Sequence, residues 1–147
     1  MIMLDTDVCI ELLKGNQRVL RQRDRHDGPV GVCFMTVAEL YYGAEKSREP
    51  GRNMDAIDRF LLTVEVVQSD LSILRRFGAL KAELQKEGIP LADADVLIAA
   101  ATLDASDGLF ASTTKMPTWS ASDGKLSLTR WLRSFQWNRN WFSSADS

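Results

Sequence analysis

The sequence predicts an α/β fold with a mainly parallel central sheet, and two observations support this prediction. Short apolar runs alternate along the chain with longer segments in which apolar residues recur at helical spacing. Capping residues, glycines and prolines separate these segments. Strands that alternate with helices are typical of a parallel sheet joined by crossover helices, and we find no internal repeat.

The first elements follow from the pattern near the N-terminus. Residues 1–4 are apolar and are predicted to form a buried strand, and a helix with four apolar residues between 8 and 13 follows it. Gly15 gives the stop signal of that helix. Residues 30–34 form a second apolar run, and residues 36–39 (Thr-Val-Ala-Glu) have the capping-box pattern that opens a helix.

The middle of the chain continues the alternation of predicted helices and strands. Pro50-Gly51 indicates a loop, residues 54–61 carry apolar side chains at helical spacing, and residues 64–67 are predicted to be the third strand. Ser69 or Asp70 then caps a long helix. The predicted apolar face of that helix consists of Leu71, Leu74, Phe77, Leu80 and Leu84.

Two more elements complete the predicted sheet. Gly88 is the stop signal of the long helix, and residues 90–95 lead into an apolar helix over 96–103. Residues 109–111 (Leu-Phe-Ala) are predicted to be the fourth strand. We treat residues 1–147 as a single domain, in which residues 112–147 are an atypical C-terminal segment.

The composition changes at Ser112. All of the tryptophans lie beyond it, at Trp119, Trp131, Trp137 and Trp141. Residues 113–141 also contain five basic residues and a single acidic one, Asp123. Three interpretations stay open: the tryptophans pack on the domain or a dimer surface, the segment holds RNA by stacking and charge, or the coding frame changes near Ser112, which sequencing the native locus would test.

Charge and composition limit the classes of function. The net charge is −2, so the overall charge does not indicate nucleic-acid binding, although a metal bound to acidic residues can supply positive charge for a phosphate. No apolar run reaches the roughly 20 residues of a membrane span. The N-terminus lacks the basic and apolar regions of a signal peptide, so we expect a cytoplasmic protein.

The two cysteines and the one histidine argue against a zinc site. Cys9 and Cys33 lie in apolar segments and are predicted to be reduced, buried thiols. His26, in a polar stretch, is predicted to lie in a surface loop or at a helix end, which argues against a zinc site. The sequence contains no glycine-rich phosphate loop, no nucleophile elbow and no DNA-binding motif.

Several carboxylates lie at or near the predicted starts of helices, most of them directly after a predicted strand. Asp5 and Asp7 follow the first strand, Glu39 lies just inside the helix after the second, and Asp93 and Asp95 flank the start of the apolar helix. Ligands of open parallel sheets bind at the carboxyl ends of the strands. Such oxygen donors suit Mg²⁺ or Mn²⁺, and a divalent cation can lower the pKa of a bound water and clamp a phosphodiester. The pattern therefore predicts a phosphoryl-transfer site.

Each of these carboxylates also has a structural interpretation, because acidic residues are favoured at helix N-termini. Asp7 could cap the first helix, and Glu39 could complete a capping box with Thr36. Asp93 could cap the apolar helix, with Asp95 as a favourable charge in its first turn.

Three segments resemble the motifs of VapC-type PIN domains, the toxins of type II toxin–antitoxin systems. They read MLDTD at residues 3–7, MTVAELYYGAEKS at residues 35–47 and GIPLADADVLIAAA at residues 88–101. The resemblance covers about residues 1–111 and implies a three-layer α/β/α fold and a Mg²⁺- or Mn²⁺-dependent endoribonuclease. It assigns the catalytic, metal-binding carboxylates to Asp5, Glu39 and Asp95, with Asp93 and Asp7 as accessory ligands. It also implies a homodimer and an antitoxin through which operator DNA is bound.

The chain departs from the family after the fourth strand. There the family carries a Thr-Asn-Asn or Thr-Asn-Asp segment, whereas residues 110–117 read FASTTKMP. Neither Asp104, Asp107 nor Asp123 matches the missing group by position, so the fourth site residue is unassigned.

Two rival functions belong to different classes. A haloacid-dehalogenase-type phosphatase also begins with a strand and Asp-x-Asp. Its pattern has Thr or Val two residues after the second Asp, whereas this chain has Cys9 there. A catalytically inactive PIN-fold module would bind an antitoxin or a partner helix and cleave nothing. A metal titration separates the module from the nuclease, because the module need not bind Mn²⁺.

Overall fold

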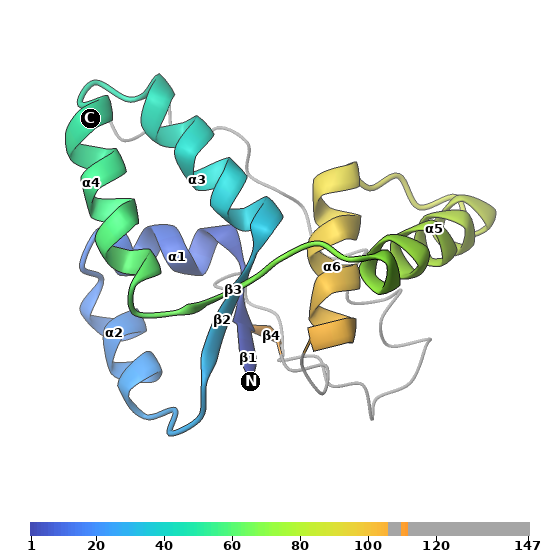
Figure 1. Cartoon of the computed structure of the whole chain (residues 1–147), viewed down its shortest axis with the longest axis horizontal. Helices are drawn as coiled ribbons and strands as arrows, with labels where there is room; N and C mark the ends of the chain where they lie inside the picture. Colours follow the sequence, from blue (N-terminus) through green and yellow to red (C-terminus); the bar gives the residue numbers. More distant parts are fainter. Residues whose placement is uncertain (106–109, 112–147) are drawn as a thin grey trace.

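The computed structural model describes residues 1–105 and 110–111, which form a four-stranded sheet with helices on both faces (Figure 1). The strands are β1 (Ile2–Leu4), β2 (Val30–Cys33), β3 (Glu65–Val67) and β4 (Phe110–Ala111), in the order β3-β2-β1-β4. Each neighbouring pair is parallel. The predicted α/β fold with a parallel sheet is therefore confirmed.

The helices form an outer layer on each face of the sheet, as Figure 1 shows. One face carries α1 (Thr6–Leu13), α2 (Gln17–Asp24), α3 (Phe34–Lys46) and α4 (Pro50–Leu61). The other face carries α5 (Leu71–Lys86) and α6 (Asp93–Ala105). This is the expected three-layer α/β/α arrangement.

Successive strand residues enter two separate cores because side chains alternate between the faces of a sheet. Met3 and Cys33 pack with α5 and α6, whereas Leu4 and Val32 pack with α1, α3 and α4. All four side chains are buried. Helices cover both faces, which explains why the strands read as continuous apolar runs rather than as alternating patterns.

Helix α3 begins earlier than the sequence indicated. Its N-cap is Cys33, whose Sγ accepts a hydrogen bond from the backbone N–H of Met35 at 3.4 Å. Thr36 lies inside the first turn and Glu39 beyond it, so the predicted capping box is wrong. The physical reason is that β2 runs into α3 without an intervening turn, and the last strand residue itself becomes the cap.

Two other helices differ from the prediction. Pro50 is the first residue of α4 rather than part of a loop, a position that suits proline because it needs no backbone donor there. Helix α2 was not predicted, since its sequence is almost entirely polar and only Val19 and Leu20 contact the core. Asn16 caps it, and His26 lies just beyond its end, at a helix-end position as predicted.

The buried face of α5 is rotated from the predicted one. Leu71 and Leu74 are 70% and 47% exposed, so their assignment to the core face was wrong. Leu80 and Leu84 are buried in the core with α6, as predicted, and Ile73 is buried there in place of the two exposed leucines. Asp70 is the cap: its Oδ1 accepts a hydrogen bond from the N–H of Ile73 at 2.9 Å.

The observed orientation of α5 predicts that two nearby substitutions by alanine change the free energy of unfolding by different amounts. Ile73→Ala should lower the free energy of unfolding by about 2–5 kcal/mol, because it leaves a cavity in a packed core. Leu71→Ala should change it by no more than about 0.5 kcal/mol, because its side chain is largely in water. Urea unfolding followed by circular dichroism measures both, and equal costs would contradict the described packing of α5.

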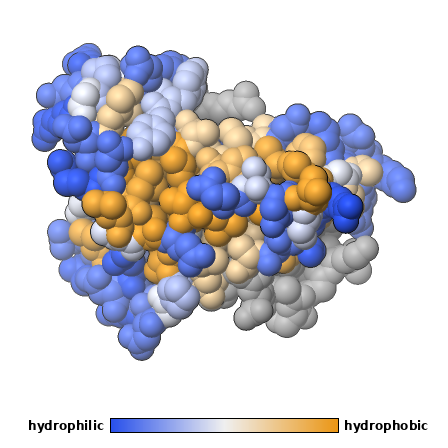
Figure 2. Space-filling model, in the orientation of Figure 1, coloured by the Kyte–Doolittle hydropathy of each residue, from blue (hydrophilic) through white to orange (hydrophobic). Residues whose placement is uncertain are grey.

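Some predictions fall on residues that the structure does not describe. These are the contribution of residue 109 to the fourth strand and every interpretation of residues 112–147, including the tryptophans and the departure from the fourth motif. Within residues 1–105 and 110–111, no helix has both the length and the apolar content needed to cross a membrane. Figure 2 shows hydrophobic residues across the middle of one face, between hydrophilic surfaces over the outer helices.

Candidate active site

Asp5 lies where β1 ends and α1 begins. It is the N-cap of α1, and its Oδ1 accepts a hydrogen bond from the N–H of Val8 at 2.8 Å. Its side chain is buried, with 2% of the residue exposed. The cap role that the sequence left open for Asp7 therefore belongs to Asp5. A buried carboxyl group at this point places oxygen donors at the carboxyl-end edge of the sheet.

Glu39 is tied to the same edge by a neighbour of Asp5. The hydroxyl of Thr6 donates a hydrogen bond to Oε2 of Glu39 at 2.6 Å, across 33 positions of sequence. Thr6 is 1% exposed, and Glu39 is partly buried in α3. Because Thr6 directly follows Asp5, this bond fixes the carboxylate of Glu39 to the strand-to-helix junction that also holds Asp5.

Asp95 lies on α6, which covers the other face of the sheet. It lies in the first turn of α6, where the N–H of Val96 donates to the carbonyl of Ala92 at 3.2 Å and starts the helix. Helix α6 runs opposite to the strands, so its first turn lies toward their carboxyl ends (Figure 1). Asp95 is 6% exposed, and α6 packs against α3 and β2.

Asp93 occupies a different environment from Asp95. Its side chain is 63% exposed and forms an ion pair with Lys81 of α5. It is the first residue of α6, and the cap role considered for it is not seen, because the carbonyl of Ala92 already accepts the first helical hydrogen bond. The structure thus separates the two aspartates: one is buried, and the other lies at the surface.

Asp7 lies one turn before Glu11 in α1. Burial raises the pKa of its carboxyl group, and the negative charge of Glu11 raises it further. Both effects disfavour the ionised form, and a nearby cation would oppose them. The expected accessory role of Asp7 stays a prediction.

The chemistry of these carboxylates fits a hard divalent cation, because Asp5, Glu39 and Asp95 offer only oxygen donors and two of them are buried. Among residues 1–105 and 110–111, however, no three histidine, cysteine, aspartate or glutamate side chains lie close enough together to hold a metal ion. The described residues supply suitable ligands without forming a complete ligand set, so their assignment as ligands stays a prediction.

Two threonines lie beside these carboxylates: sequence reasoning did not single out Thr6, and it considered Thr36 only as part of a capping box with Glu39. Thr6 positions Glu39, and only its place between Asp5 and Asp7 could have indicated a role. Thr36, one turn before Glu39, is fully buried, and its hydroxyl has no hydrogen-bond partner. A buried polar group without a partner costs free energy, so Thr36 is a second polar group held near this junction at a cost to stability.

The pKa values of the two thiols are raised by burial and by nearby carboxylates. Burial raises the pKa of Cys9 well above the usual thiol range, and the charge of Asp5 adds to the effect. The pKa of Cys33 is also raised by burial, with a smaller contribution from Glu39. Both cysteines are free and buried, which confirms the prediction from sequence.

Reaction of these thiols should report unfolding. The thiolate is the reactive form, so raised pKa values and burial should make labelling of the native protein by Ellman's reagent at pH 8 at least about 100-fold slower than in guanidinium chloride. Raising the pH from 7 to 8 should leave the native thiols protected. Fast reaction of either cysteine in the native state would contradict the described burial. The sequence contains only these two cysteines, so complete labelling amounts to two equivalents.

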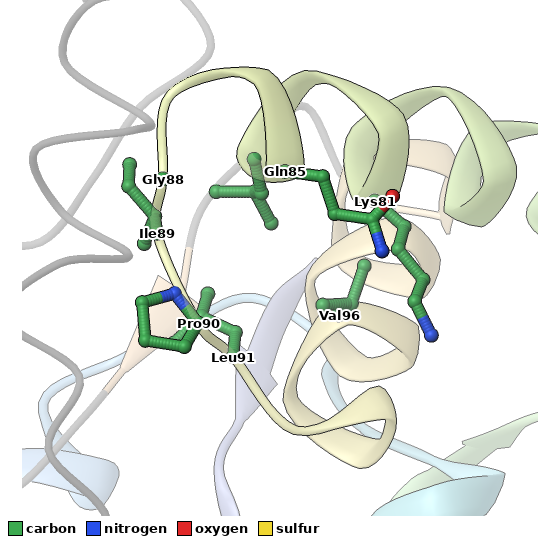
Figure 3. Close-up of a pocket in the computed structure, with 8 residues that line it drawn as sticks. Lys81, Gln85, Gly88, Ile89, Pro90, Leu91 and Val96 are labelled. Carbon is green, nitrogen blue, oxygen red and sulfur yellow. The ribbon is translucent and has the colours of Figure 1, made fainter.

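A cavity of about 370 Å³ has a lining that contains none of the candidate carboxylates. It opens between the end of α5, the following connection and the start of α6 (Figure 3). Its lining consists of Lys81, Leu84, Gln85, Gly88, Ile89, Pro90, Leu91 and Val96. None of Asp5, Glu39 and Asp95 lines it, so this cavity and the candidate active site are separate features.

Comparison with known proteins connects this geometry to one family. The family model of the PIN domain matches residues 2–113. The tRNA(fMet)-specific endonuclease VapC of Shigella flexneri is 36% identical over 98 residues, which cover 66% of this chain and 74% of that protein. Ribonuclease VapC2 of Haemophilus influenzae is 39% identical over 99 residues, which cover 67% and 75%.

Solved structures agree with the sequence relatives. VapBC2 of Rickettsia felis, bound to a DNA fragment from its promoter, superposes with a TM-score of 0.66 and 26% identity, over 69% of this chain and 80% of that one. DNA-bound VapBC of Salmonella typhimurium gives a TM-score of 0.65 and 31% identity, over 69% and 77%. Both are named as VapBC proteins bound to DNA.

Proposed function

The chain belongs to the PIN-domain family, in its VapC type, and from this premise we propose that it is a divalent-metal-dependent endoribonuclease, the toxin of a toxin–antitoxin pair. The observation that carries the proposal is the placement of three carboxylates: Asp5 is the N-cap of α1, Asp95 lies in the first turn of α6, and Glu39 in α3 accepts a hydrogen bond from Thr6. The ribonuclease names of the relatives support the reaction. The PIN match gives no support to the haloacid-dehalogenase alternative.

In this proposal Asp5, Glu39 and Asp95 hold Mg²⁺ or Mn²⁺, with Asp7 and Asp93 as accessory groups. The cation supplies positive charge and Lewis acidity toward a scissile phosphate. The protein supplies the orientation of its ligands: the N–H of Val8 holds the carboxylate of Asp5, and the hydroxyl of Thr6 holds that of Glu39. Ligands fixed in this way are a general requirement of metal sites.

The proposed partners follow from the relatives. The solved complexes named VapBC, two of them bound to DNA, support a cognate antitoxin and operator DNA reached through it. A homodimer and a cytoplasmic location complete the proposal. The Shigella flexneri relative is named for tRNA(fMet), which makes initiator tRNA the first substrate to test.

The test is cleavage of initiator tRNA and of total RNA by the purified chain. We expect discrete products with Mg²⁺ or Mn²⁺, no products with EDTA, and restored cleavage when excess metal is added back. Products that persist in EDTA would overturn the metal dependence. No cleavage of any RNA under any of these conditions would overturn the nuclease.

The alternative of an inactive interaction module has one observation in its favour. The described residues do not gather three possible ligands around one point. Isothermal titration with Mn²⁺ separates the two functions: the nuclease should bind the ion with a heat that is lost in an Asp5→Asn variant. Absence of binding, together with tight antitoxin binding, would favour the module.

A further inference from the structure

Helix α2 and the C-cap residue that follows it, Arg25, expose a row of arginines on one side. Arg18, Arg21 and Arg25 follow one another at intervals of three and four residues, the spacing that places side chains on one side of a helix. All three are exposed. We call them the α2 arginine face. Figure 2 shows the hydrophilic surface over this part of the molecule, at the lower left.

The arginines of this face have no acidic partners in the part of the chain that the structure describes. Two nearby basic residues do have partners. Arg23 donates to the carbonyl of Thr63 at 3.2 Å, and Nζ of Lys14 lies 3.9 Å from the carboxylate of Glu11. Residues 14–25 contain five basic residues and only one acidic residue, in a chain whose net charge is −2. The positive charge of Arg18, Arg21 and Arg25 is therefore concentrated locally and, unlike that of Lys14, is not neutralised by an ion pair among the described residues.

The same helix offers nothing to an apolar partner. Its apolar residues, Val19 and Leu20, pack toward the core under α1, α3 and α4. Of the described residues, the large hydrophobic side chains that are exposed belong to other elements: Tyr42, Leu62, Leu71 and Leu74. Protein interfaces are anchored by buried aromatic or apolar side chains, whereas nucleic-acid interfaces are polar and strongly positive. The exposed side chains of α2 fit the sugar-phosphate backbone of a nucleic acid better than they fit a protein.

We propose that the α2 arginine face binds the phosphate backbone of the RNA substrate, outside the site that cleaves it. This inference rests on the proposed ribonuclease function. From Arg18 to Arg25 the helix rises about 10 Å, so the three guanidinium groups can follow the backbone of one strand. Arginine pairs with phosphate in a bidentate manner, and such contacts fix the orientation of the RNA without reading its sequence.

The face is separated from Asp5 by the length of α1. Helix α1 starts at Asp5 and spans about 12 Å, and α2 follows after a short turn at Gly15. After α2 the chain enters β2 at Val30, which pairs with Ile2 at the amino-end edge of the sheet, so the face lies toward the edge opposite Asp5. An RNA that extends past the length of α1 contacts both. The face would thus add affinity and orientation to a site whose own charges repel phosphate.

The experiment measures binding separately from cleavage. Fluorescence anisotropy with labelled initiator tRNA is followed from 50 to 300 mM KCl, in the Asp5→Asn background with Mg²⁺ present. Replacing Arg18, Arg21 and Arg25 by glutamine should weaken binding at low salt by about 10-fold or more. It should also lower the slope of log K against log salt by about 2 to 3, one counterion release for each lost phosphate contact.

A matched control changes the same charge elsewhere. Arg59, Arg75 and Lys86 are exposed residues of α4 and α5, and their replacement by glutamine should leave the salt slope within about 0.5 of the starting protein. Both triple variants should melt close to the parent, because exposed substitutions change stability little. Equal losses in the two variants would show a general charge effect and overturn the role of the face.

The outcomes also separate this inference from the proposed function. An unchanged salt slope in the α2 variant, with metal-dependent cleavage intact in the active chain, would overturn the RNA-binding face and leave the ribonuclease standing. Unchanged RNA binding with weakened binding of purified antitoxin would reassign the face to an acidic protein segment and overturn it likewise. Failure of the parent protein to bind or cleave any RNA would overturn both.

Discussion

Replacing Asp5 with asparagine is expected to reduce metal-dependent RNA cleavage by more than about 100-fold while leaving the fold intact. Loss of a group that only supports a metal ligand typically costs 10- to 100-fold, so loss of a ligand itself should cost more. The fold should survive because asparagine caps helices about as well as aspartate, and its amide oxygen can still accept the hydrogen bond from the N–H of Val8. Single-turnover cleavage and thermal melting measure the two effects.

The chain offers a matched control for this substitution. Asp70 caps α5 as Asp5 caps α1, with its Oδ1 accepting from the N–H of Ile73 at 2.9 Å. Asp70→Asn should keep both cleavage and stability near those of the unmodified chain. If the two variants cleave RNA equally well, Asp5 acts only as a helix cap, and the structural interpretation of this carboxylate is the correct one.

Replacing Thr6 with valine is expected to lower Mn²⁺ affinity and cleavage by about 10- to 100-fold, because Glu39 loses the donor that orients it. Valine keeps the shape of threonine without the hydroxyl. Thr6→Ser keeps a donor and should restore most of the affinity and the activity. Calorimetric titration with Mn²⁺ gives the affinity independently of cleavage, so the two effects can be compared.

A buried threonine elsewhere controls for the general cost of removing a hydroxyl. Thr102 in α6 is 2% exposed and donates to the carbonyl of Ile98 at 2.8 Å. Thr102→Val should keep Mn²⁺ affinity near that of the unmodified chain. Equal losses of affinity in Thr6→Val and Thr102→Val would show that Thr6 contributes to general stability and does not position Glu39.

The fold class could be predicted because its signals are local. Each strand is a short apolar run, and each crossover helix has its own stop or cap, such as Gly88 and Asp70. The errors arose where the local pattern was ambiguous. Helix α2 has little apolar surface of its own, and Leu71 and Leu74 fit a helical period although packing against α6 selected Ile73 instead.

The candidate site was predictable as a set of residues but not as an arrangement. Asp5, Glu39 and Asp95 stand at recognisable positions in segments that resemble family motifs, and the family match confirms the family to which those segments belong. The motif position singled out Asp95 over Asp93, but it did not predict that their environments differ. Only the packing of α5 on α6 exposes the first to Lys81 and buries the second.

The sequence by itself determined the α/β class, the parallel sheet and the membership of the PIN-domain family, since these depend on short-range periodicity and on motif residues in order. The tertiary structure alone decided which carboxylates are buried, that Thr6 donates to Glu39 across 33 positions, and that Arg18, Arg21 and Arg25 face solvent without acidic partners among the described residues. Burial and long-range hydrogen bonds depend on how distant segments pack, and the local pattern of one segment carries no information about its partner.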